Sequence, residues 1–478
     1  MLLCPNTTIY IGPPGCGKTT TLLNKVEGLI ESGVPPENIG YVSFTRQAIH
    51  EAITRIIKRT GLNRDQFRNF RTLHSMAFYL LGNKLTDMLT EKDMAKAGNP
   101  AAEFETFSHM YQYHRVTGMS LEDVWDMHYS PSIYATRYDF LQWVETYEAF
   151  KHASKKSDFT DLLDDVARRK PYFPFDWLFV DEAQDLTPSQ WRMVQVLAAN
   201  ADNLVVAGDP DQTIFAWSGA DSGMLESLEG ERKILSQSYR IPRKVHVIAE
   251  RILKATKRDI LYRPTPQEGE LHWCSSEEPY HLDYDNNESW YILSRNTYYL
   301  QNIAAKLYST GIWYSYLGEG HNQQTNKAFT RLVDRYTAYC RGELKNEAYF
   351  AKECQEHSTD IAEAKKRGLA WWEAFDLWPI DRIEYLKATV GDWDSRRVRL
   401  GTFHSSKGGE ADNVVLLGET TETIHQRLQA GDIAELRAIY VAATRAKKRL
   451  FLVSSSRRSE IPWHHFINCP QDLISKLL

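Results

Sequence analysis

Residues 12–19 read Gly12-Pro13-Pro14-Gly15-Cys16-Gly17-Lys18-Thr19, a complete Gly-x4-Gly-Lys-Thr phosphate loop. The apolar run over residues 7–11 predicts a strand leading into this loop, and residues 19–31 predict a helix leaving it. The glycines allow backbone N–H groups to close around phosphate oxygens, and the helix N-terminus adds partial positive charge. The strand–loop–helix order therefore indicates a nucleoside triphosphate site; a glycine-rich turn with an exposed lysine is the alternative.

The side chains of the loop match the chemistry of a triphosphate. We expect Lys18 to reach the β- and γ-phosphates and the Thr19 hydroxyl to hold Mg²⁺. The nucleotide-binding residues predicted in this segment are Gly12, Gly15, Gly17, Lys18, Thr19 and Thr20.

Length and composition are those of a globular protein of several domains. The chain has 478 residues, of which 42% are hydrophobic and 25% charged, and the length predicts about three domains. It contains neither an apolar run of about 18 residues nor a signal-peptide pattern, so we expect no membrane partner and a cytoplasmic location. The six cysteines form no C-x2-C pair, which argues against a zinc site or a disulfide framework. A net charge of −5 excludes a uniformly basic surface but leaves room for a local basic track.

Short apolar runs alternate with helical patterns in two regions of the chain. The first region contains residues 10–11, 39–44, 177–180 and 203–207, and the second contains 291–293, 398–402, 413–417 and 450–453. This alternation predicts two α/β cores with parallel sheets covered by helices on both faces.

Each predicted core is interrupted by a mainly helical insertion. The expected division gives residues 1–75 and 157–236 to the first core, with 76–156 as its insertion. Residues 237–317 and 397–478 form the second core, with 318–396 as a small insertion.

A second motif ends an apolar strand in adjacent carboxylates. Leu178-Phe179-Val180-Asp181-Glu182-Ala183-Gln184-Asp185 is a Walker B arrangement. We expect Asp181 to hold Mg²⁺ through its water shell and Glu182 to take the proton from the attacking water. A plain acidic strand end is the alternative, and the phosphate loop argues against it.

The third motif couples a polar sensor to aromatic side chains. In Gly208-Asp209-Pro210-Asp211-Gln212-Thr213-Ile214-Phe215-Ala216-Trp217, the predicted strand ends in a turn that presents Gln212. This glutamine could sense the γ-phosphate or orient water. Phe215 and Trp217 follow within five residues and could form a platform for stacking bases.

Taken in order, ten segments between Gly12 and Arg449 resemble the motifs of superfamily 1A DNA helicases of the UvrD/Rep type. The resemblance implies two RecA-like motor domains that bind ATP and Mg²⁺ between them. In addition to the three segments quoted above, the matching stretches are Val42-Ser43-Phe44-Thr45, Arg71-Thr72-Leu73-His74-Ser75, Asp158-Phe159-Thr160-Asp161-Leu162-Leu163, Leu235-Ser236-Gln237-Ser238-Tyr239-Arg240, Leu293-Ser294-Arg295-Asn296, Thr402-Phe403-His404-Ser405-Ser406-Lys407-Gly408-Gly409-Glu410 and Tyr440-Val441-Ala442-Ala443-Thr444-Arg445-Ala446.

The resemblance adds residues to the nucleotide site. It implies that Arg240 and Arg445 project from the second core as arginine fingers toward the γ-phosphate. It also implies that Tyr239 stacks on the adenine and that Glu410 bonds the ribose. Surface ion pairs are the alternative for the arginines, and ordinary interface packing for the other two. The implied catalytic set is Lys18, Asp181, Glu182, Gln212, Arg240 and Arg445.

The resemblance also nominates a nucleic-acid track. Trp217 would stack on bases without sequence preference, while hydroxyl and imidazole groups would meet phosphates. Core packing is the main alternative for Phe44 and Phe215. The nominated residues are Phe44, Thr72, His74, Phe215, Trp217, Arg295, Thr402 and His404.

The chain departs from the family pattern at the positions expected to contact the adenine base and in the second insertion. No glutamine stands among the eleven residues before Gly12, and Thr20 stands where the family often has arginine, so strictness for ATP stays open. The second insertion is much smaller than the family's accessory domain, as in the compact versions that phages often encode. A bacterial or phage-infected cell is the expected source.

The resemblance implies an ATP-dependent 3′→5′ DNA helicase that translocates on single-stranded DNA and meets single-strand/duplex junctions. The alternative is a nucleic-acid-stimulated NTPase that remodels protein–DNA or RNA complexes with little unwinding. A binding module without catalysis is a third reading, and the intact catalytic set argues against it. Pathway, loading partner and oligomeric state stay open, and a monomer is compatible with the sequence.

Overall fold

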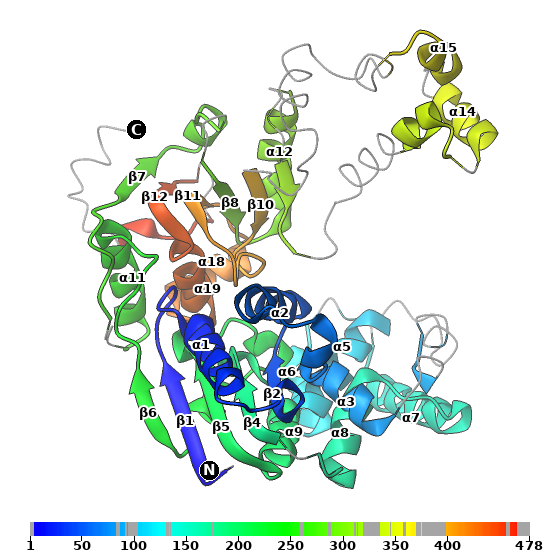
Figure 1. Cartoon of the computed structure of the whole chain (residues 1–478). Helices are drawn as coiled ribbons and strands as arrows, with labels where there is room; N and C mark the ends of the chain where they lie inside the picture. Colours follow the sequence, from blue (N-terminus) through cyan, green and yellow to red (C-terminus); the bar gives the residue numbers. More distant parts are fainter. Residues whose placement is uncertain are drawn as a thin grey trace. The chain divides into compact units, whose positions relative to one another are not determined.

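The computed structural model describes residues 4–465 with gaps, the longest at 94–103, 319–334 and 375–397 (Figure 1). Residue contacts divide the chain into two units. The first comprises Met1–Arg240 and Ile260–Thr265, and the second comprises Ile241–Asp259 and Pro266–Leu478. Each unit is built on one six-stranded sheet, and all the strand pairs are parallel. The predicted α/β class with two parallel sheets is confirmed.

The sheet of the first unit has the strand order β3-β2-β4-β5-β1-β6. Pairing of Ile11 with Gly208 places the end of β1 beside the end of β5, and β4 lies on the other side of β5. Because parallel strands end at one edge, the loops that follow β1, β4 and β5 start side by side. The strand bounds are β1 Asn6–Ile11, β2 Ile39–Ser43, β3 Phe70–Thr72, β4 Phe175–Val180, β5 Ala201–Gly208 and β6 Glu231–Ile234.

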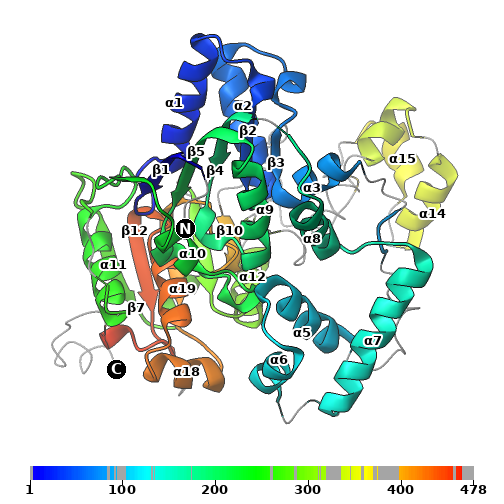
Figure 2. The same ribbon diagram turned by 90° about the horizontal axis from the view of Figure 1, so that it is seen from below.

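Apolar cores cover both faces of this sheet. Adjacent residues of β4 show the alternation, because Leu178 packs in one core cluster and Phe179 in the other. Helices α8 and α9 contribute to the first cluster, and α1 and α2 contribute to the second (Figure 2). The helix bounds are α1 Lys18–Glu31, α2 Arg46–Thr60, α3 Leu73–Leu81, α8 Phe159–Arg169, α9 Pro188–Ala198 and α10 Ser222–Glu226.

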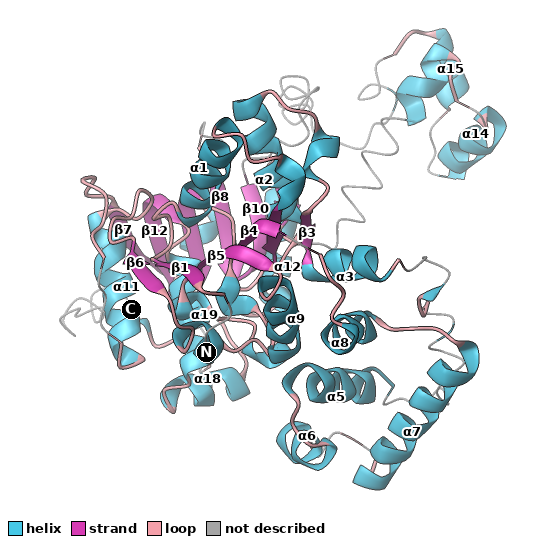
Figure 3. Ribbon diagram, turned by 60° about the horizontal axis from the view of Figure 1, so that its bottom comes forward, coloured by secondary structure: helices cyan, strands magenta, loops and turns pink. Residues whose placement is uncertain are grey.

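The described part of the first insertion is mainly helical, with short loops between the helices (Figure 3). Its main helices are α5 Phe104–Thr117, α6 Leu121–His128 and α7 Arg137–Ser154. They bury their own aromatic core, which includes Phe107, Trp125, Phe140 and Trp143. The insertion therefore folds around side chains of its own and meets the α/β core at defined points.

The second unit repeats the parallel architecture with the order β7-β12-β11-β8-β10-β9. Within the second insertion, most of which lies outside the described residues, residues 335–341 and the short helices α14 and α15 are helical. The remaining bounds are β7 Glu270–Cys274, β8 Trp290–Ser294, β9 Tyr314–Tyr316, β10 Val398–Thr402, β11 Ala411–Leu417, β12 Ala446–Val453, α11 Arg243–Ala255, α12 Leu300–Ser309, α14 Glu347–Glu356, α15 Ile361–Lys366, α18 Glu422–Gln429 and α19 Ile433–Ala443.

The structure differs from the sequence expectation at the edges of the sheets. Strands β3, β6, β7 and β9 were not expected, and each lies at or next to a sheet edge. All four residues of β6 are exposed, so no buried face imposes an apolar pattern on its sequence. Among the described residues, no helix has the length and apolarity to cross a bilayer.

Candidate nucleotide site and nucleic-acid track

The phosphate loop joins β1 to α1 through two residues with left-handed backbone. Gly15 has φ +69° and Gly17 has φ +84°, a region that glycine adopts without steric cost. Gly17 is also the N-cap of α1, so the free N–H groups of the first helical turn begin at the loop. Together these features make the concave backbone that an anion requires.

Lys18 lies folded over the loop. Its Nζ donates to the carbonyl oxygens of Gly12 at 2.8 Å and Pro13 at 3.2 Å, and its side chain is buried. Burial lowers the pKa of Lys18, but the charges of Cys16, Asp209, Glu182 and Asp181 outweigh it and raise the pKa overall. The ammonium is therefore charged and held over the backbone of the phosphate loop.

The loop and the Walker B strand meet through Thr19 and Asp181. The Thr19 hydroxyl donates to Asp181 Oδ2 at 2.8 Å, and the Tyr41 hydroxyl donates to the same oxygen at 2.8 Å. Burial, followed by the charge of Glu182, raises the pKa of Asp181 to about 6. A hydroxyl beside a carboxylate is a hard-oxygen donor set that suits Mg²⁺. The structure thus brings together the two residues predicted to hold the metal. Tyr41 was missed, although a tyrosine in an otherwise apolar strand was a readable signal.

A chain of hydrogen bonds runs from the Walker B motif to the third motif. Gln184 Nε2 donates to Glu182 Oε2 at 2.5 Å, and Gln184 Oε1 accepts from the backbone N–H of Asp209 at 3.0 Å. Gln212 Nε2 in turn donates to Asp209 Oδ2 at 2.7 Å. Glu182 has φ +54°, a conformation that costs energy for a residue with a side chain and is typical of functional sites.

These hydrogen bonds connect Glu182 and Gln212, which the sequence predicted separately. They pass through two further residues, Gln184 and Asp209. Gln184 and Asp209 lie inside the quoted motifs, but no role was assigned to them. A Cβ on Gly208 would lie 2.8 Å from Gln184 Oε1, so glycine at this position allows the amide to approach β5. We conclude that the two motifs form one polar assembly.

The segment containing Tyr239 and Arg240 packs directly on the phosphate loop. The Ser238 hydroxyl donates to Pro14 O at 2.9 Å, and the Tyr239 N–H donates to Gly15 O at 2.8 Å. A Cβ on Gly15 would lie 2.4 Å from the Cβ of Arg240. The sequence assigned residues 237–240 to the second core, whereas the structure groups them with the first unit because these contacts attach them to the loop.

The aromatic side chains of the predicted track form a row in the first unit. Phe44 and Phe215 are stacked with ring centroids 5.5 Å apart, and Trp217 meets Phe215 edge-on at 6.5 Å. Both phenylalanines are half-buried, and Trp217 is 56% exposed. The row therefore begins with supported rings and ends in one that is open to solvent.

Thr72 and His74 lie at the neighbouring strand end. Thr72 pairs with Ser43, the last residue of β2, and caps α3 by accepting from the Ser75 N–H at 3.3 Å. Burial lowers the pKa of His74, whose ring contacts Phe159 edge-on at 6.1 Å. His74 is consequently neutral at pH 7 and suited to a hydrogen bond with a phosphate more than to an ion pair.

In the second unit, Thr402 ends β10 and pairs with Ser294, the last residue of β8, and Arg295 follows Ser294. The guanidinium of Arg295 forms a bidentate ion pair with Glu435, at 2.6 and 3.0 Å. Glu435 is only 4% exposed and was not identified from the sequence, which gives no signal for a partner 140 residues away. The Thr402 hydroxyl accepts from the Ser405 N–H at 3.1 Å, in the turn that also contains half-buried His404.

Arg445 and Glu410 differ strongly in exposure. Arg445 is 1% exposed, and its Nε donates to Val441 O at 2.8 Å while Nη1 donates to Gly409 O at 3.2 Å. Main-chain carbonyls thus fix the guanidinium within its own unit. Glu410 is exposed and lies 3.7 Å from Lys447 Nζ.

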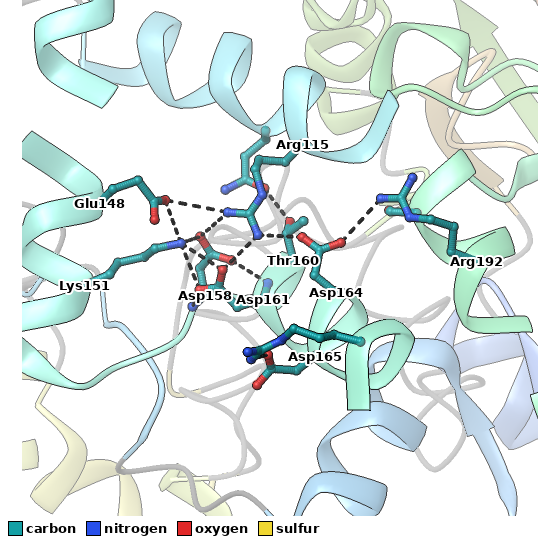
Figure 4. Close-up of polar contacts among 12 residues, drawn as sticks. Arg115, Glu148, Lys151, Asp158, Thr160, Asp161, Asp164, Asp165 and Arg192 are labelled. Atoms are coloured by element: carbon teal, nitrogen blue, oxygen red, sulfur yellow. Dashed lines mark hydrogen bonds and ion pairs between the residues drawn. The ribbon is translucent and has the colours of Figure 1, made fainter. Parts of the chain in front are cut away.

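The acidic segment ahead of the Walker B motif belongs to a charged cluster rather than to the nucleotide site (Figure 4). Lys151 of α7 contacts Asp158 at 3.1 Å and Asp161 at 2.9 Å, and Arg115 of α5 contacts Asp161 at 2.8 Å and Asp164 at 2.7 Å. Because the aspartates begin and line α8, the cluster attaches the helical insertion to the α/β core.

The phosphate loop, the Walker B aspartate and the parallel sheets define a P-loop NTPase fold. A family model described as the UvrD/REP helicase N-terminal domain matches residues 3–233, and one described as the UvrD-like helicase C-terminal domain matches residues 380–457. The chain belongs to the UvrD/Rep family of superfamily 1 helicases.

Curated relatives carry helicase names and are longer than this chain. A "Probable DNA helicase II homolog" of Mycoplasma pneumoniae is 26% identical over 51% of this chain and 39% of its own length. An "ATP-dependent DNA helicase Rep" of Buchnera aphidicola is 24% identical over 51% and 40%. An "ATP-dependent DNA helicase PcrA" of Leuconostoc citreum is 26% identical over 67% and 49%. The chain spans 39–49% of these three relatives.

Proposed function

We propose that this protein is an ATP-dependent DNA helicase that translocates 3′→5′ on single-stranded DNA and acts at single-strand/duplex junctions. The observation that carries the proposal is the hydrogen-bonded chain from Glu182 to Gln212, which links the phosphate site to the turn holding Phe215 and Trp217. The names of the relatives support DNA as the nucleic acid.

The residues around the phosphate loop bind the triphosphate and accept the proton of the attacking water. Lys18 and the loop backbone hold the β- and γ-phosphates, and Glu182 accepts the proton of the attacking water. Mg²⁺, held through Thr19 and Asp181, neutralises phosphate charge when it is bound. Arg240, beside Gly15, and Arg445 serve as further catalytic cations, while Tyr239 and Glu410 contact the base and the ribose.

The Gln212 end of the hydrogen-bonded series couples loss of the γ-phosphate to a change in DNA binding. Gln212 responds to the γ-phosphate, and its partner Asp209 also accepts a hydrogen bond from the Asp211 N–H at 3.1 Å. A shift of Gln212 therefore strains the short turn between β5 and Trp217, whose ring stacks on a base. Thr72, His74, Arg295, Thr402 and His404 position the phosphates of the strand without reading its sequence.

The test has two stages. ATP hydrolysis is first measured with single-stranded DNA, duplex DNA and RNA, using Lys18→Ala as the inactive control. Unwinding of 3′-tailed and 5′-tailed duplexes is then compared. Stimulation by single-stranded DNA and unwinding of the 3′-tailed duplex alone support the proposal. Preference for the 5′ tail overturns the polarity, and stronger stimulation by RNA with little unwinding favours an RNA-remodelling NTPase instead.

A further inference from the structure

The exposed end of the aromatic row contacts a histidine from the helical insertion. The imidazole of His109, on α5, stacks on the ring of Trp217 with centroids 6.1 Å apart and planes inclined by 15°. His109 is exposed, and Trp217 remains 56% exposed beside it. The pair therefore presents ring surface to solvent and does not fill a core.

Helix α5 is fixed against the turn that carries Trp217 at a second point. Gly219 has φ +91°, and a Cβ there would lie 2.7 Å from Val116 Cγ2 and 3.0 Å from Thr117 Cγ2. Val116 and His109 are seven residues apart, which places them on the same face of the helix, two turns from one another. The close approach of backbone to α5 thus holds His109 at the tryptophan.

A ring of α6 contacts His109 and is itself packed against a further ring of α5. The ring of His128, on α6, meets His109 edge-on with centroids 5.5 Å apart, and Tyr113 meets His128 edge-on at 4.9 Å. Edge-to-face contacts of this kind are favourable and directional. The contact with His128 is compatible with the orientation of the His109 ring, which is nearly parallel to the indole of Trp217.

We propose that the single-stranded DNA track continues from the α/β core onto the insertion, with His109 as the stacking platform next to Trp217. This inference rests on the proposed function and deepens it. The continuity of the row, from Phe44 through Phe215 and Trp217 to His109, is the argument for a nucleic-acid base as the occupant. Every base has a π-face, so such a platform binds without sequence preference.

The test measures the dissociation constant of a fluorescent oligo-dT by anisotropy at fixed salt, for the wild type, His109→Ala and His109→Phe. Loss of one stacking platform weakens binding about fivefold or more, and phenylalanine restores it to within about twofold. His152→Ala is the matched control, because His152 is an exposed histidine on α7 away from the row. This control binds as the wild type does.

Two further readouts separate a stacking role from a structural one. Thermal unfolding of His109→Ala coincides with that of the wild type, because His109 is exposed. The DNA concentration that gives half-maximal ATPase rises while the maximal rate stays the same. Unchanged or tighter binding by His109→Ala, or failure of phenylalanine to restore binding, overturns the inference. A wild-type protein that binds no single-stranded DNA instead overturns the proposed function itself.

Discussion

The Thr19 hydroxyl donates a 2.8 Å hydrogen bond to Asp181, across 162 residues of sequence. This contact joins the phosphate loop after β1 to the end of β4. The two oxygen-bearing groups are therefore positioned by the fold, so that binding does not need to bring them together.

Asp181→Asn should lower the maximal ATPase rate at least about 100-fold, because an amide keeps the shape of the side chain but loses the charge that holds the metal. The measurement is steady-state ATP hydrolysis with saturating oligo-dT over a series of Mg²⁺ concentrations. Asp202→Asn, at an exposed position of β5, is the control and should hydrolyse ATP at the wild-type rate. A substantial rate for Asp181→Asn would contradict the assignment.

Gln184→Ala should reduce the DNA-stimulated ATPase rate about 10- to 100-fold, the effect of losing a hydrogen bond to a charged group. The amide holds Glu182 and the backbone of Asp209 at once, so its removal frees the proton acceptor and breaks the link to Gln212. Exposed Gln142 on α7 provides the control Gln142→Ala, which should behave as the wild type. Equal rates for the two variants would show that the hydrogen-bonded chain does not contribute.

The sequence predicted the parts of the site that are local in the chain. Lys18, Thr19, Asp181 and Gln212 stand in short motifs whose spacing follows from one strand end and the loop after it. Strand–loop–helix order and short apolar runs sufficed for the central strands of both sheets. A central strand of a parallel sheet is buried on both faces, so its residues are nearly all apolar, and this run can be recognised in the sequence alone.

Long-range pairings and edge strands had no such signal. Glu435 gives no indication in sequence that it binds Arg295, and β6 carries four exposed residues with no alternation. His109 is one of 15 histidines and became notable only when α5 brought it to Trp217. The membership of Arg240 in the first unit likewise depends on hydrogen bonds to the loop rather than on its motif.

Arg295→Ala should lower the free energy of unfolding by about 3 kcal/mol, because Glu435 is left buried without its bidentate partner. Urea unfolding checks this value. Arg427, whose Nη1 lies 3.8 Å from Glu435, is 57% exposed and supplies the control: Arg427→Ala should cost less than about 1 kcal/mol.

The double variant Arg295→Met/Glu435→Leu separates pairing from packing. Removing both charges avoids an unpaired buried carboxylate, so the double variant should be more stable than Arg295→Ala alone. Weaker DNA binding that persists in the double variant would then report a direct role of Arg295 in the track. A double variant less stable than the single one would show that the ion pair itself is strongly favourable.

Lys151→Ala should destabilise the first unit by about 3 kcal/mol at pH 7. The ammonium contacts Asp158 and Asp161, and Asp158 is only 4% exposed. Removing the ammonium therefore leaves these carboxylates with less neutralising positive charge. Arg168→Ala removes a cation of α8 whose side chain is 73% exposed, and this substitution should cost less than about 1 kcal/mol. Similar losses for the two variants would contradict a buried anchoring role for Lys151.

The pH dependence of that difference tests the electrostatic cause. Burial acts to raise the pKa of Asp161, but hydrogen bonds from Lys151 and Arg115 outweigh it and lower the pKa below its usual value. A carboxylate with a lowered pKa stabilises the fold above its unfolded pKa of about 4, and this stabilisation is lost as the pH falls toward the folded value. The difference in free energy of unfolding between wild type and Lys151→Ala should therefore be constant from pH 7 to 5 and shrink below about pH 4. Urea unfolding at pH 7, 5, 4 and 3.5 measures it, and a difference that stays constant down to pH 3.5 would assign the loss to packing of the lysine chain instead.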